Sequence, residues 1–142
     1  MVVVLIIALL IAIAIPTFLG ARNRAYDRAA QAALRNAMTA AKTSFADSGD
    51  YGKATAANLH AIEPSLTFVV GASTNATTVS VTTPAANAPI WWAEVFSKSN
   101  KCFGIEDQSG NGLGTTYAGG TTALTAPCTA PATDPQFPDS GW

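Results

Sequence analysis

The sequence opens with MVVVLIIALLIAIAI over residues 1–15, a stretch without a polar side chain that ends at Pro16. A helix of this length would extend roughly 22 Å, whereas a bilayer core is about 30 Å thick. If the helix continues through Pro16 to residue 21, just before Arg22, it is long enough to cross a membrane. A helix that is apolar on all sides has little to bury against in so small a domain. We therefore expect residues 1–21 to be buried in a membrane or against other protein chains.

A secretory signal peptide is the main alternative for this stretch. Such a peptide carries a basic segment before its apolar core and a small-residue cleavage site after it. Nothing basic precedes the apolar run here, and no convincing cleavage site follows it. The abrupt apolar start suggests instead that Met1 is not the natural beginning of the chain.

The chain continues from Thr17 to about residue 47 with a composition rich in alanine, the best helix former. Four apolar side chains recur at helical spacing and predict one buried stripe: Leu34, Met38, Ala41 and Phe45. The turn formers after residue 46 predict the end of the helix. The sequence thus predicts an N-terminal helix over residues 1–47, with an apolar part (1–21) and an amphipathic part (22–47). An interruption is expected near Pro16, because proline removes one backbone donor and clashes with the carbonyl group four residues earlier.

Residues 48–142 change in character to threonine, serine, glycine, asparagine and proline, and we expect a globular, β-rich head there. Short β-branched or aromatic runs predict strands at residues 66–70, 77–82, 90–96 and 102–105. The short connections favour an antiparallel arrangement, since helical crossovers do not fit between them. No regular element is predicted from residue 110 onward. The predicted fold class is α+β: a long helix packed on a small antiparallel sheet, followed by a loop-rich C-terminal region.

Charge is scarce and uneven. Only 12% of the 142 residues are charged and the net charge is −1, which argues against a nucleic-acid binder that relies on a bulk basic surface. Residues 1–46 carry five basic groups and one acid, whereas residues 47–142 carry three basic groups and eight acids. Arginines directly after the apolar run would place the head in the cytoplasm by the positive-inside rule, but the two cysteines favour an oxidising exterior. A basic leader upstream would resolve this conflict.

Catalytic and metal-binding patterns are weak. His60 is the single histidine, so a histidine-based metal cluster or catalytic triad has no partners to draw on. Residues 107–112 resemble the start of a calcium loop, but Ala118 stands where that loop needs a bidentate glutamate. Asn75 begins an N-glycosylation sequon. We expect no enzymatic activity, no cofactor and no metal.

The only two cysteines, Cys102 and Cys128, enclose a loop-rich segment. In an exterior protein a disulfide between them would constrain the unfolded chain by roughly 3 kcal/mol. Two buried free thiols are the alternative.

Residues 1–35 resemble the N-terminal helix of bacterial type IV pilins, a family in which a long apolar run ends in the motif found here at residues 12–16, AIAIP. In that family the mature chain begins with a Phe-Thr-Leu-Ile-Glu-Leu stretch that this sequence lacks, so the roles of those residues cannot be carried over. The resemblance covers the helix closely and the rest only in architecture. It also implies local unwinding between Ala8 and Pro16 in the filament and a disulfide-bounded C-terminal region at Cys102 and Cys128.

The resemblance further implies a structural pilin, cleaved by a prepilin peptidase, held in the inner membrane and then assembled by pilus machinery into an extracellular homopolymer. Adhesion, motility and DNA uptake are all open as roles of such a fibre. A pseudopilin of a type II secretion system and a monomeric membrane-anchored binding module are the alternatives. The residues expected to lie in the filament core or membrane are Val2, Val3, Val4, Leu5, Ile6, Ile7, Leu9, Leu10, Ile11, Ile13 and Ile15.

Overall fold

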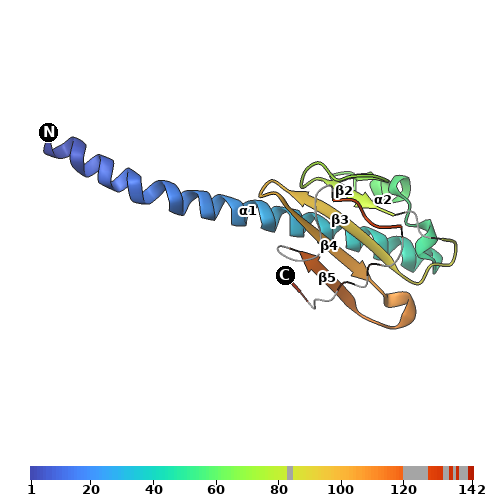
Figure 1. Ribbon diagram of the computed structural model, residues 1–142. Coiled ribbons are helices and arrows are strands. Elements are labelled where there is room, and N and C mark those ends of the chain that lie inside the picture. Colours follow the sequence, from blue (N-terminus) through green and yellow to red (C-terminus); the bar gives the residue numbers. More distant parts are fainter. Residues whose placement is uncertain (83–84, 120–127, 133–134, 136, 138–140) are drawn as a thin grey trace.

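The protein has an α+β fold in which one long helix, α1, supports a five-stranded sheet (Figure 1). Its N-terminal part extends away from the rest of the molecule, and its C-terminal part lies against the sheet. Residues 1–21 are called the stem below, and residues 48–142 the head. This computed structural model describes residues 1–82, 85–119, 128–132, 135, 137 and 141–142.

Helix α1 spans Val2–Ser48 and ends at Gly49, which adopts a left-handed conformation with φ 69°. The backbone N–H of Gly49 donates to the carbonyl oxygen of Phe45 at 2.6 Å, a glycine cap of the common left-handed type. The predicted end near residue 47 is therefore confirmed within one residue.

The predicted interruption at Pro16 is wrong, because α1 continues through this residue. Proline fixes φ near −65°, a value that suits a helix, and its costs are the hydrogen bond that its nitrogen cannot donate and the close approach of its ring to the carbonyl group four residues earlier. The Thr17 hydroxyl donates to the carbonyl oxygens of Ala14 at 2.9 Å and Ile13 at 3.3 Å. These contacts give the polar backbone beside the proline additional partners.

The C-terminal part of α1 packs on one face of the sheet through small side chains. Its predicted stripe is confirmed, with Leu34 and Ala41 fully buried and Met38 and Phe45 partly buried against the same core. Most of the buried residues are alanines, which allow the helix to approach the sheet closely. The buried residues of α1 are Ala30, Ala33, Leu34, Ala37, Ala40, Ala41 and Ser44.

The sheet has the strand order β1-β2-β3-β4-β5. Strands β2 to β5 are antiparallel, but β1 pairs with β2 in parallel, so the sheet is mixed and the expectation of a purely antiparallel sheet is wrong at this edge. Residues 70–77 carry the chain back to the starting end of β1, and the Asn75 side chain closes a turn there by accepting from the N–H of Thr77 at 2.9 Å. The strands are β1 Thr67–Val69, β2 Thr78–Val81, β3 Trp91–Ser97, β4 Lys101–Asp107 and β5 Thr115–Gly119.

Three short helices and strand β5 were not predicted from the sequence. They are η1 (Tyr51–Lys53), α2 (Ala56–Ile62) and η2 (Ser109–Asn111). Thr55 caps the start of α2, and its hydroxyl oxygen accepts from the N–H of Asn58 at 3.4 Å. Isolated helices of this length are unstable, so tertiary contacts rather than local propensity hold them.

Part of the C-terminal segment, including Ala130 and Phe137, lies on the second face of the sheet. A small apolar cluster forms there from Trp92, Ala118, Ala130 and Phe137. The predicted disulfide is confirmed: Cys102 in β4 is bonded to Cys128, with their Cα atoms 5.6 Å apart.

Candidate functional site

The stem is an exposed apolar surface. All eleven valine, leucine and isoleucine residues expected in a filament core or membrane are between 50% and 72% exposed, and Phe18 and Leu19 extend the same surface. A contiguous apolar surface of this size is rare on monomeric soluble proteins and marks a site of association or membrane contact. Helix α1 contains the one segment, among the residues that the structure describes, that is long and apolar enough to cross a membrane.

The length of the stem matches a bilayer. Residues 2–21 in helical conformation extend about 30 Å, the thickness of a typical hydrocarbon core. Arg22 and Arg24 follow in the next turn, and both are exposed. The transition from apolar to basic surface therefore occurs within one helical turn.

The head is fastened to α1 directly beyond the stem by Asp27. One carboxylate oxygen of Asp27 accepts hydrogen bonds from the hydroxyl groups of Ser97, at 2.8 Å, and Ser99. The other oxygen pairs with the Lys101 ammonium group at 3.2 Å. These partners all lie in the hairpin that joins β3 to β4. Asp27 thus fixes the hairpin tip against the helix.

The electrostatics of Asp27 follow from these contacts. Partial burial acts to raise its pKa, but the hydrogen bonds from Ser99, Ser97 and Lys101, together with the charge of Lys101, outweigh burial and hold the pKa below its ordinary value. The carboxylate is therefore ionised at neutral pH, and the contact is made as a charged group.

The hairpin tip has a defined shape. Ser97 lies opposite Lys101 in the β3–β4 register, which leaves a three-residue loop over residues 98–100. Asn100 adopts a positive φ of 64° and donates its N–H to the Ser97 carbonyl oxygen at 2.9 Å. A left-handed third residue is typical of such loops, and asparagine tolerates it.

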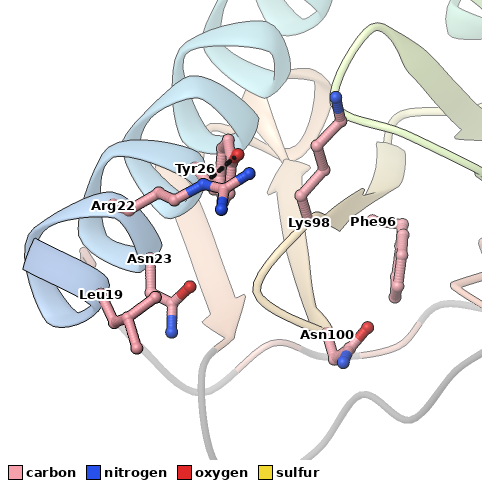
Figure 2. Close-up of a pocket in the computed structure, with 7 residues that line it drawn as sticks. All are labelled: Leu19, Arg22, Asn23, Tyr26, Phe96, Lys98 and Asn100. Carbon is pink, nitrogen blue, oxygen red and sulfur yellow. Dashed lines mark hydrogen bonds between the residues drawn. The ribbon is translucent and has the colours of Figure 1, made fainter. Parts of the chain in front are cut away.

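A hollow of about 450 Å³ lies between α1 and this hairpin (Figure 2). Two cations lie near the Tyr26 ring, with the Arg22 guanidinium carbon 5.3 Å and the Lys98 ammonium nitrogen 5.9 Å from its centre. Arg22 Nε also donates to the Tyr26 hydroxyl oxygen at 2.6 Å. The residues lining this hollow, called the junction pocket below, are Leu19, Arg22, Asn23, Tyr26, Phe96, Lys98 and Asn100.

A second, shallow apolar hollow lies on one face of the stem and is lined by residues of α1 alone. Leu19 lines both hollows, so the apolar one adjoins the junction pocket on its stem side. The residues lining the apolar hollow are Ile11, Ala14, Ile15, Phe18 and Leu19.

The Asp107 carboxylate is held by contacts within the protein. Lys42 of α1 pairs with its carboxylate at 2.9 Å, and the hydroxyl groups of Thr115 and Tyr51 donate to it. Burial acts to raise the pKa of Asp107, but hydrogen bonds from Tyr51, Lys42 and Ser109 hold it below its ordinary value. These protein donors engage both oxygens of Asp107. The carboxylate at the first position of the calcium-loop pattern is therefore already hydrogen-bonded within the protein. Within the described part of the chain, no group of three or more potential metal ligands is found.

Glu94 is a buried acid that the sequence analysis did not single out. It is only 3% exposed, and burial raises its pKa to about 7. It lies opposite Ser80 in β2 and Gly104 in β4, on the face that the C-terminal segment covers. A second buried acid, Glu106, lies on the same face of β4 and accepts from the N–H of Phe137 at 3.2 Å.

Two other sequence-derived candidates lie apart from the stem. Asn75 of the sequon uses its side-chain oxygen to accept from Thr77 and Thr78 in the turn before β2. His60 lies in α2, where its Nδ1 is 2.8 Å from the carbonyl oxygen of Leu66. Neither residue contributes to the surface formed by the stem and the junction pocket.

Comparison of the chain with known protein families, curated proteins and solved structures finds no match. The architecture itself, a long apolar N-terminal helix joined to a small sheet, is compatible with a pilin-like fold.

Proposed function

We propose that this chain is a structural pilin. Its stem anchors the subunit in a membrane before assembly, and the same stem then mediates polymerisation into an extracellular type IV pilus filament. The observation that carries the proposal is the exposed apolar stem, continuous with the helix that supports the head. The resemblance of residues 1–35 to type IV pilins supports the same function. It also suggests the prepilin peptidase and the pilus assembly machinery as partners.

The energetics of the stem favour both stages. On an insertion scale, the valines, leucines and isoleucines of the stem contribute about −0.3 to −0.6 kcal/mol each, or roughly −3 to −7 kcal/mol together. The same surface can be buried against neighbouring stems, at about 1.5–3 kcal/mol for each large side chain. A contact that repeats without closing would produce a helical fibre.

Two features favour a pilin over a calcium-stabilised pseudopilin or a soluble enzyme. The Asp107 carboxylate, the first oxygen donor of the calcium-like pattern, is already held by Lys42, Tyr51, Ser109 and Thr115. Most of the large apolar side chains that are exposed among the described residues lie on the stem, as an association surface requires.

The test is to image the cell surface by electron microscopy with an antibody to the head. Leu9→Asp places a charge at the middle of the stem, at a cost of about 2.5–3.5 kcal/mol for membrane insertion, and should abolish the fibres. Leu9→Met keeps size and polarity and serves as the matched control. The head should remain folded in both variants, as judged by its tryptophan fluorescence.

Normal fibres from Leu9→Asp would overturn burial of the stem in a filament core. Wild-type cells that display the head but no filament containing this chain would overturn polymerisation and favour a membrane-anchored binding module.

A further inference from the structure

We propose that the junction pocket binds the headgroup phosphate of an anionic phospholipid while the stem is in the membrane. This inference rests on the membrane stage of the proposed function and adds a specific ligand to it. Three properties of the site support this inference: its position relative to the membrane surface, its uncompensated positive charge and its continuity with an apolar hollow.

The position of the pocket along the helix axis matches the headgroup layer of a bilayer. Along the helix axis Arg22 lies about 4.5 Å and Tyr26 about 10.5 Å beyond Leu19, the last large apolar residue of the stem. The polar layer on each side of a bilayer is about 5–8 Å thick. A stem that fills the hydrocarbon core therefore places Arg22 within this polar layer and Tyr26 just beyond it, with the Tyr26 side chain tilted back toward the layer as in any α-helix.

The charge of the pocket suits an anion. Within the described ranges, neither Arg22 nor Lys98 has a carboxylate within ion-pair distance. Asp27, the one acid in the first 46 residues, is already held by Ser97, Ser99 and Lys101. The pocket therefore has an excess of positive charge, although the head as a whole is acidic.

The polar groups in the pocket are arranged to donate. The Tyr26 oxygen accepts from Arg22, which leaves the Tyr26 hydroxyl proton available for a bound oxygen atom. Arg22 retains its terminal N–H groups, and the Lys98 ammonium group faces the same ring from the hairpin (Figure 2). Guanidinium, ammonium and phenol donors from two elements thus line the same hollow, and all three groups can donate to an oxyanion.

The adjoining apolar hollow indicates a lipid rather than a free anion or a protein carboxylate. It continues from Leu19 toward Ile11 along the stem, within the part that would lie in the hydrocarbon core. A phosphate in the junction pocket would leave the attached acyl chain next to this hollow. One molecule with an anionic head and an apolar tail occupies both.

The experiment uses the full chain purified in a mild detergent, and native mass spectrometry counts the phosphatidylglycerol or phosphatidylcholine molecules of identical acyl chains that it retains. We expect the wild type to retain about ten times more phosphatidylglycerol than phosphatidylcholine. Arg22→Gln or Lys98→Gln should reduce phosphatidylglycerol retention about tenfold, because each substitution removes one charged hydrogen bond. Arg24→Gln is the matched control, since it removes the same charge two residues away and Arg24 does not line the pocket. It should retain the lipid as the wild type does.

Several results would overturn the inference. Equal losses in Arg24→Gln and Arg22→Gln would mean diffuse attraction without a site, and displacement of the lipid by millimolar inorganic phosphate would mean a simple anion site. If Arg22→Gln and Lys98→Gln retain the lipid but fail to form fibres, the pocket binds a second copy of the chain instead. Resistance of the chain to alkaline extraction from cell membranes is measured in parallel. Extraction-resistant protein without lipid preference refutes the lipid site alone, whereas extractable protein refutes the membrane stage itself.

Discussion

Replacing Glu94 by glutamine should stabilise the head at neutral pH. The carboxyl group is 3% exposed, and burial raises its pKa from 4.5 to about 7. At about 1.4 kcal/mol per pH unit, this difference corresponds to up to roughly 3 kcal/mol of stability. Glutamine has the shape of the protonated acid but cannot ionise, so Glu94→Gln avoids the cost of a buried charge.

The sign of the pH dependence follows from proton binding. Between pH 4.5 and about 7 the folded protein holds a proton on Glu94 that the unfolded chain has released. The free energy of unfolding should therefore fall by up to roughly 3 kcal/mol across this window in the wild type. Asp27, Asp50 and Asp107 have lowered pKa values and act only at more acidic pH.

The assay is urea unfolding of the full chain in detergent, followed by tryptophan fluorescence at several pH values from 4.5 to 7.5. All three tryptophans lie in the head, so the signal reports on the head rather than on the stem. At pH 7.5 the urea midpoint of Glu94→Gln should exceed that of the wild type by about 2 M, for an m-value near 1.5 kcal/mol/M. Asp47→Asn makes the same chemical change at an exposed position and should have little effect. If Glu94→Gln shows the same fall in stability with pH as the wild type, the reasoning is refuted.

Two further predictions concern the links that hold the head together. Asp27→Asn should lower the free energy of unfolding at pH 7 by about 1–2 kcal/mol and speed proteolysis at residues 97–101. It should also remove the part of the stability that the wild type loses as the pH falls below about 4. If the variant loses as much stability below pH 4 as the wild type does, the role given to Asp27 is contradicted. Reduction of Cys102–Cys128 should cost about 3 kcal/mol and expose residues 104–129 to protease first, whereas a Cys102→Ser/Cys128→Ser double variant should not respond to reductant. Unchanged protease sensitivity after reduction would count against a stabilising role for the bridge.

Features that depend on neighbouring residues in the sequence were predictable. The stem follows from an unbroken apolar run, and the end of α1 from the turn formers around Gly49. Four of the five strands were found from β-branched and aromatic runs. Pro16 shows the limit of local rules, because the fixed φ of proline suits a helix once the flanking turns are helical.

The junction pocket could not be predicted, because its parts are far apart in the sequence. The residues that α1 contributes meet Lys98 and Asn100 only after the sheet has packed on the helix. The Asp27 contacts that fasten the hairpin beside the pocket depend on the same packing. A single acid among basic residues is the one available signal, and its spacing suggests Arg24, three residues away, as the partner rather than the hairpin that the structure shows. The burial of Glu94 was equally inaccessible, since it depends on a C-terminal segment without a recognisable pattern.

Because α1 is continuous from stem to head, the number of residues in the stem determines the direction in which the head points around the helix axis. Each residue of an α-helix advances the chain by about 1.5 Å and turns it by about 100°. Deleting one residue between Val2 and Pro16 would therefore keep the stem apolar but swing Asp27 and the attached hairpin roughly a quarter turn around the helix axis, relative to the stem residues that precede the deletion. In a fibre held by its stems, the stem thus sets which side of each head faces its neighbours and which side faces the surroundings.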